Sequence, residues 1–224
     1  METLLPKTSY APDEELVEKI KQGETALFEV LIRRYNPLLY KIARSYGFLH
    51  HDAEDLLQET HYTAFMYLAS FRQEASYKTW LTKIHLSRCY HKMNSAHNKH
   101  ETAAGNSMDN ETNILHTSAD SRETEKSVLN RELASVLEKS LQQLPPLYRT
   151  VFVLREVEGF SVAETAELLG ITPVNVKVRV NRAKALLQKQ LETVYSAADL
   201  YEFHFKYCDK IVNHVFERNA ATQS

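Results

Sequence analysis

Apolar residues recur at helical spacing along two stretches of the chain, and a polar stretch divides them. The first stretch begins at Asp13 and continues to about Met93, with breaks at Gly23 and Gly47. Residues 97–124 are rich in Asn, Ser, Thr and acidic side chains and show no steady period, which is typical of a linker. The longer helices that the first stretch predicts span residues 27–45, 52–70 and 77–94.

The periodic pattern resumes at Glu125. An apolar stripe ends before Pro145, and residues 147–157 predict a further helix that leads into two helices meeting at one glycine. The sequence therefore predicts an all-α fold of two helical domains joined by a flexible polar linker, plus an extra C-terminal amphipathic helix. The segments are an N-terminal domain at 13–96, the linker at 97–124, a C-terminal domain at 125–192 and an extension at 193–224.

The two helices that meet at Gly170 have the local signals of a helix-turn-helix. Ser161 with Glu164 three residues later forms a capping-box pattern before the first helix. Gly170 supplies the positive φ that ends this helix. Thr172 and Pro173 then cap and open the second helix.

The second of these helices has one apolar face and one polar, basic face. The residues expected to face the core are Val176, Val180, Ala183 and Leu187. Another face is shared by Asn175, Val178, Arg179 and Arg182. From Ile171 to Gln190 there are five basic residues and no acidic one, so positive charge gathers where DNA phosphates would lie. We interpret this helix as one that reads a major groove; a solvated basic helix is the alternative.

The net charge of −2 hides a segregation of charge along the chain. Residues 81–100 contain four basic side chains and no acidic one, whereas residues 101–125 contain six acidic side chains and one Arg. The two cysteines, Cys89 and Cys208, lie far apart and fit a reducing cytosol without a disulfide. The chain shows no signal-peptide pattern and no apolar run long enough to cross a membrane. We therefore expect a cytoplasmic protein without membrane insertion, and no cofactor.

An amphipathic helix is also predicted in the extension, between Tyr195 and Arg218. Its apolar stripe holds Tyr201, Phe205, Cys208, Val212 and Val215. We expect this helix to pack on the adjacent helix-turn-helix domain, with an intermolecular partner as the alternative. His204, Cys208 and His214 lack a fourth ligand, so no metal site is expected.

Four short motifs carry a family resemblance. DAEDLLQE at 52–59, FRQEASYKTWL at 71–81, LPPLYRTVF at 144–152 and the helix-turn-helix follow one another in an order and spacing that resemble an extracytoplasmic-function (ECF) sigma factor of the sigma-70 family. The resemblance spans about residues 13–191. It implies a bacterial initiation subunit that binds RNA polymerase core, recognises a −35 and a −10 promoter element and opens the duplex. It also implies that the chain has no catalytic activity of its own.

The helix that starts near Asp52 carries several carboxylates close to the positive end of its dipole, and a well-capped solvated helix explains them equally well. The resemblance favours a docking surface for the clamp helices of the largest polymerase subunit, with the flap region as a further contact of the protein. The residues carried over are Asp52, Asp55, Gln58 and Glu59. Leu56 and Leu57 are expected to pack in the core. His61 replaces the family's usual aromatic residue, and we interpret it as a core or rim histidine.

Residues 71–80 interleave aromatic and basic side chains, which suits unpaired DNA because bases stack on aromatic faces. Core anchoring is the alternative, favoured for Trp80. The resemblance implies a pocket for a flipped −10 base formed by Gln73, Glu74, Ala75, Ser76 and Tyr77. Contacts along the nearby strand are expected from Lys83, Arg88, His91, Lys92 and Asn94. The sequence departs from the family at Gln73, where glycine is usual, and at Leu86-Ser87, where Arg-Asn is common.

The residues expected to contact the −35 element lie on the second helix of the helix-turn-helix and just before it. They are Thr172, Asn175, Lys177, Val178, Arg179, Asn181, Arg182 and Lys184. An anti-sigma factor is a further candidate partner, including for the extension. The alternative function is a stand-alone helix-turn-helix transcriptional regulator. An enzyme is not expected, because no constellation of nucleophile, base and oxyanion donors is present.

Overall fold

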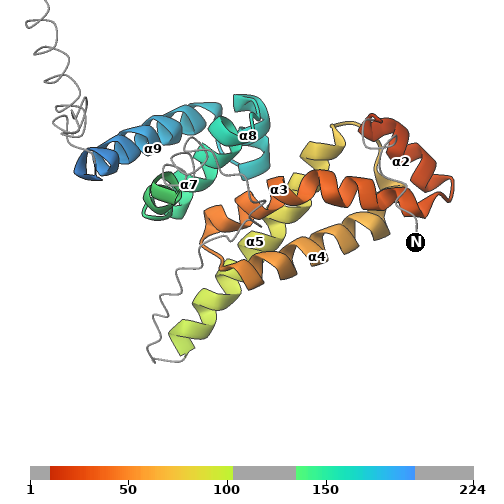
Figure 1. Cartoon of the computed structure of the whole chain (residues 1–224), viewed down its shortest axis with the longest axis horizontal. Helices are drawn as coiled ribbons and strands as arrows, with labels where there is room; N and C mark the ends of the chain where they lie inside the picture. The colour runs from red at the N-terminus through yellow and green to blue at the C-terminus, as the bar shows by residue number, and fades with distance from the viewer. Residues whose placement is uncertain (1–10, 103–134, 195–224) are drawn as a thin grey trace, which may run out of the picture. The chain divides into compact units, whose positions relative to one another are not determined.

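The computed structural model describes residues 11–102 and 135–194 of the 224-residue chain, and every regular element in these ranges is a helix (Figure 1). The first range holds α2 (Asp13–Lys21), a 3₁₀ turn (Thr25–Leu27), α3 (Phe28–Tyr46), α4 (His50–Tyr67), a second 3₁₀ turn (Leu68–Ser70) and α5 (Tyr77–Thr102). The second range holds helical residues 135–142, α7 (Pro146–Phe152), a π-helical turn (Val153–Val157), α8 (Val162–Leu169) and α9 (Pro173–Val194). The all-α prediction is confirmed.

Helices α3, α4 and α5 pack against one another and form the main core. Leu31, Leu39 and Ile42 of α3 and Leu81 of α5 are completely shielded from solvent. These α3 residues recur at helical spacing, which is why one face of the helix turns inward. The helix continues through Pro37. The three helices thus provide a rigid support for the loops and grooves between them.

A buried polar chain crosses the contact between α4 and α5. Thr60 Oγ1 lies 2.8 Å from His85 Nδ1, and His85 Nε2 lies 3.6 Å from the sulfur of Cys89. Burial lowers the pKa of His85 to about 4 and raises the pKa of the Cys89 thiol to about 12. His85 is therefore neutral, and each of its ring nitrogens has a neighbour. The buried polar groups of Thr60, His85 and Cys89 are thus partnered with one another while all three remain neutral.

The helix-turn-helix part contributes to the same core. Leu154 and Phe160, which follow α7, belong to the apolar cluster that contains Leu31. Arg149 of α7 is buried, and it donates from Nε to the carbonyl of Ser45 at 2.6 Å and from Nη1 to the carbonyl of Gln142 at 2.7 Å. Two carbonyl acceptors hold this guanidinium in place. The described residues up to Leu187 belong to one compact unit, and the last residues of α9 belong to a second.

Several helix ends differ from the sequence prediction. Helix α4 begins two residues earlier than expected and gives way to a 3₁₀ turn at Leu68. Helix α5 continues to Thr102, eight residues beyond its expected end at residue 94. Between Tyr77 and Gly105 the sequence contains no glycine or proline, and a polar composition alone does not end a helix. The expected linker beyond residue 102, the helix start at Glu125 and the amphipathic helix of the extension lie outside the described residues.

Candidate functional site

The turn between α8 and α9 has the geometry that the sequence predicts. The backbone N–H of Ser161 donates to Glu164 Oε2 at 2.8 Å, and the N–H of Glu164 donates to Ser161 Oγ at 3.1 Å. The hydrogen bond from Ser161 lowers the pKa of the Glu164 carboxyl. Gly170 has a φ of 61°, and Thr172 Oγ1 accepts from the N–H of Asn175 at 3.2 Å. These reciprocal caps fix the angle at which α9 starts.

Helix α9 turns an apolar face inward and a basic face toward solvent. Val176, Val180, Ala183 and Leu187 are buried, as predicted. Arg182 is exposed, with Nη1 3.3 Å from the hydroxyl of Tyr148, and Arg179 is partly exposed. The other exposed −35 candidates are Thr172, Asn175, Lys177, Val178, Asn181 and Lys184. Lys184 differs because it forms an ion pair with Glu156 at 2.8 Å.

One residue on this face was missed by the sequence analysis. Val174 is 68 % exposed at the start of α9. It lies out of phase with the buried stripe of the helix, which is the signal that identifies it. An apolar side chain at the start of a recognition helix can make an apolar contact with the methyl group of thymine.

The loop between α4 and α5 encloses a small cavity of about 310 Å³. All five residues expected around a flipped base line it, together with Phe71 and Glu14. Gln73 has a φ of 58°, the only positive φ among the described non-glycine residues. Glycine adopts this conformation without steric cost, which explains why glycine is usual at this position. Gln73 is held there by a hydrogen bond from its Nε2 to Glu18 at 2.9 Å.

Aromatic packing anchors the two ends of this loop. The ring of Trp80 lies 4.9 Å from that of Phe71 and 5.7 Å from that of Tyr77, measured between centroids. Phe71 and Tyr77 are buried and Trp80 is half-buried. Ser76 caps α5 by accepting from the N–H of Thr79 at 3.1 Å. Trp80 thus packs as a core anchor, which is the role that the sequence analysis favours for it.

The cations of α5 pair with carboxylates of α4. Arg88 Nη1 lies 2.6 Å from Glu59 Oε2, and Lys92 Nζ lies 2.7 Å from Asp52 Oδ1. Lys83 lies 3.7 Å from Glu167 of α8. His91 is exposed and Asn94 is half-exposed. Two residues expected on the polymerase-docking surface therefore lie beside residues expected to contact the −10 strand.

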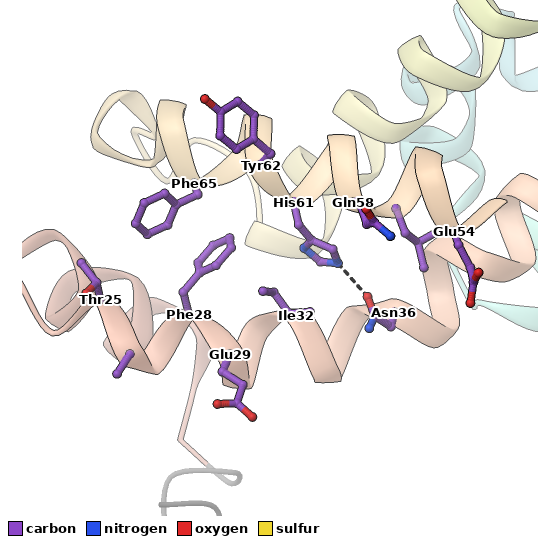
Figure 2. Close-up of a pocket in the computed structure, with 12 residues that line it drawn as sticks. Thr25, Phe28, Glu29, Ile32, Asn36, Glu54, Gln58, His61, Tyr62 and Phe65 are labelled. Carbon is purple, nitrogen blue, oxygen red and sulfur yellow. Dashed lines mark hydrogen bonds between the residues drawn. The ribbon is translucent and has the colours of Figure 1, made fainter. Parts of the chain in front are cut away.

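On its other side, α4 borders an open groove with α3, about 920 Å³ in volume (Figure 2). The rings of Phe28 and Phe65, which both line it, pack edge to face with their centroids 5.0 Å apart. On its floor, His61 Nε2 lies 2.9 Å from Asn36 Oδ1. Burial lowers the pKa of His61 to about 4, so the ring is neutral near pH 7. His61 is a buried core histidine, as interpreted from the sequence.

The structure separates the four docking candidates around α4. Gln58 lines the groove with α3, whereas Asp52 and Glu59 face α5. Asp55 lies 3.4 Å from the ring of His51. Leu56 and Leu57 are buried, as expected. The sequence analysis missed the exposed apolar residues near the groove, which are Tyr62, Phe65, Met66 and Tyr67.

Two family models match the chain in the order of its two helical parts. Sigma-70 region 2 matches residues 31–98, and sigma-70 region 4 matches residues 135–187. Among the described residues, none of the helices has the length and hydropathy of a membrane span.

Similar proteins are RNA polymerase sigma factors. The ECF sigma factor SigM of Mycobacterium tuberculosis is 30 % identical over 179 residues, which cover 80 % of this chain and 84 % of SigM. SigW of Bacillus subtilis is 29 % identical over 180 residues, covering 78 % of this chain and 94 % of SigW. The solved structure of sigma factor RpoE with the anti-sigma factor NepR from Bartonella quintana covers 74 % of this chain and 96 % of that chain, with a TM-score of 0.59 and 26 % identity.

CnrH, solved in complex with the cytosolic domain of CnrY, has a TM-score of 0.56 and 25 % identity over 81 % of this chain and 97 % of that chain. Sequence, fold and the order of the two regions agree. The chain belongs to the ECF sigma factors of the sigma-70 family, the subunits that direct promoter-specific initiation by RNA polymerase.

Proposed function

We propose that this sigma factor binds core polymerase, the −10 element and the −35 element with three different surfaces. The α3–α4 groove docks on the polymerase core, the loop cavity before α5 takes an unpaired −10 base, and the exposed face of α9 reads the −35 element. The observation that carries the proposal is the cavity of about 310 Å³ at residues 71–77, on a chain that also presents a capped helix-turn-helix. A stand-alone DNA-binding regulator has no use for a base-sized cavity outside its helix-turn-helix.

The groove suits a helical partner. Its walls carry Phe28, Ile32 and Phe65, and Tyr62 at its edge is 69 % exposed. An amphipathic helix binds such a groove by inserting apolar side chains, and the polar rim at Gln58 fixes its register. We assign this surface to the clamp helices of the largest polymerase subunit. The flap region is assigned to the helix-turn-helix domain.

The −10 surface combines the loop cavity with the cations of α5. Lys83, Arg88 and Lys92 border a second hollow between α4 and α5. Every side chain in their ion pairs with carboxylates is about one-third exposed or more, and such pairs contribute little to stability. DNA phosphates can therefore displace them at little cost. This arrangement supports a path for the unpaired strand along α5 that leads to the cavity.

The −35 surface is the solvent face of α9. The acid-free run from Ile171 to Gln190 places its cations along one helix that starts at a fixed turn. Exposed Asn175, Val178 and Arg182 lie within the first turns of that helix, which is where recognition helices contact base edges. Lys177 and Arg179 flank them and suit phosphate contacts.

The remaining assignments follow from this role. The chain acts in the cytoplasm, has no catalytic activity of its own, and needs no metal or cofactor. An anti-sigma factor is a candidate regulator, since two similar sigma factors were solved with a bound protein, NepR in one and the cytosolic domain of CnrY in the other.

Run-off transcription from a genomic promoter pool, with and without added core polymerase, tests the proposal. We expect promoter-specific transcripts only when core and sigma factor are both present. Gln58→Lys should weaken core association, because it places a charge at the groove rim. Gln58 is a cleaner position than Glu59, whose reversal also breaks the pair with Arg88. Gln22→Lys, at an exposed position that does not line the groove, is the matched control. Specific duplex binding by the chain alone, with no core-dependent transcription, contradicts the proposal.

A further inference from the structure

The loop cavity is lined by a residue that lies far from the loop in sequence. Glu14, in the first turn of α2, borders the same hollow as Glu74 and Tyr77. Its volume of about 310 Å³ is at the small end of the range for ligand pockets. Helix α2 is thus part of the base pocket that the proposed function requires.

Helix α2 is fixed against the loop by two further side chains. Glu18 accepts a hydrogen bond from Gln73 Nε2 at 2.9 Å, and Lys21 Nζ donates to the carbonyl of Phe71 at 3.0 Å. Glu14 lies four residues before Glu18, so both carboxylates project from the same face of the helix. The contacts of Glu18 and Lys21 therefore hold Glu14 at the mouth of the cavity.

The polar groups that line the cavity are mainly hydrogen-bond acceptors. Glu14 and Glu74 each offer a carboxylate, and no Lys or Arg of the described residues lines the hollow. Gln73 uses its amide nitrogen on Glu18, which leaves its carboxamide oxygen to accept. Ser76 is occupied with Thr79 at the start of α5. At the wall, the hydroxyl of Tyr77 is buried without a hydrogen-bond partner among the described residues.

Two carboxylates are unexpected where DNA is bound, because they repel the phosphate backbone. Their favourable interaction with a nucleotide is with donors on the base edge, as when Glu or Asp accepts from the amino group of cytosine. Adenine, cytosine and guanine each carry an exocyclic amino group. Thymine has none, and its N3–H lies between two carbonyl oxygens that a carboxylate repels.

We propose that Glu14, together with Glu74, makes this pocket select an unpaired −10 base that bears an exocyclic amino group and reject thymine. The inference rests on the proposed function, in which the loop takes a flipped base. Glu14 is then a specificity-determining residue, and Glu18 and Lys21 are positioning residues that act through the loop.

The test is run-off transcription with reconstituted holoenzyme on a promoter identified in the pool experiment. Each −10 position is replaced in turn by thymine, and by an analogue that lacks only the amino group: inosine for guanine, purine for adenine or zebularine for cytosine. At the position that the pocket reads, we expect thymine and the analogue each to lower transcription about tenfold, the effect of one lost base contact.

The variants are Glu14→Gln, Glu74→Gln and the double variant, since Gln keeps the side-chain size and supplies a donor for a carbonyl. We expect the double variant to reduce the thymine penalty to about twofold or less at that position and to leave the others unchanged. Glu15→Gln is the matched control, because Glu15 is on the same helix but pairs with Lys19 at 2.7 Å and does not line the cavity. Glu14 and Glu74 are exposed, so the variants should fold, which thermal unfolding checks.

An amino-group preference that persists unchanged in the double variant overturns the role of the carboxylates. Equal acceptance of thymine at every −10 position by the wild-type protein also overturns it. The proposed function fails in a different way: transcription would not depend on added core, or abasic substitution at each −10 position would have no effect. The two failures are therefore distinguishable in the same set of templates.

Discussion

His61 should make the protein sensitive to acid, and the size of the effect can be worked out from its burial. The residue is 6 % exposed, its Nδ1 has no hydrogen-bond partner among the described residues, and burial lowers its pKa from 6.5 to about 4. The unfolded chain therefore binds a proton at a higher pH than the folded protein does. The stability contributed by the neutral ring is complete above pH 6.5 and is lost as the pH falls toward 4.

Linkage gives a loss of about 2 kcal/mol in the free energy of unfolding through His61 alone between about pH 7.5 and pH 5. His85, whose pKa is also lowered to about 4, contributes a similar loss. Domains of this kind have a total stability of about 5–15 kcal/mol. The two histidines together should therefore remove about 4 kcal/mol by pH 5, which is a large part of that total.

Urea unfolding followed by far-ultraviolet circular dichroism, at both pH values, measures the effect. His61→Gln keeps a donor for Asn36 and removes the titration, so its loss of stability on acidification should be about 2 kcal/mol smaller than that of the wild type. His51→Gln is the control, because the side chain of His51 is 87 % exposed. If wild type and His61→Gln lose equal stability between the two pH values, the reasoning from burial is wrong.

Three shorter predictions concern the helix-turn-helix. Arg179→Ala should lower the slope of log binding constant against log salt for holoenzyme on promoter DNA by about 0.9 if the side chain contacts a phosphate, and an unchanged slope argues against that contact. Ser161→Ala should cost about 1 kcal/mol of unfolding free energy, because it removes a cap that both hydrogen bonds define. Gly170→Ala should lower the free energy of unfolding by about 1 kcal/mol through its φ of 61° alone, since open space surrounds the position. Gly170→Asn should lower it less. Equal stability of the wild type and both variants would contradict the backbone strain expected at this φ.

The parts of the structure that could be predicted from the sequence are those fixed by local signals. The capping box at Ser161, the glycine at 170 and the buried stripe through Val176 depend on residues within a few positions of one another. The end of α5 was misplaced because a polar composition resembles a linker while still permitting a helix. Local rules give helices and turns but not where a polar helix stops.

The placement of α4 and α2 depends on long-range packing. Nothing in the pattern of α4 indicates that Glu59 faces α5 while Gln58 faces the groove, because adjacent exposed residues diverge by about 100° around a helix. Glu14 reaches the loop cavity from some sixty residues away, and no spacing rule connects it to Glu74. The candidate −10 loop was found through resemblance, whereas its contact with α2 required the fold.

The buried thiol of Cys89 can report when the packing between α4 and α5 opens. The side chain is fully shielded and burial raises its pKa to about 12, so neither the reagent access nor the thiolate that alkylation needs is available in the native state. Labelling of Cys89 must therefore wait for α4 and α5 to separate. In a Cys208→Ser variant, the rate of iodoacetamide incorporation measures how often the two helices separate. Comparing this rate with and without bound core polymerase tells whether docking at α4 keeps α4 and α5 together.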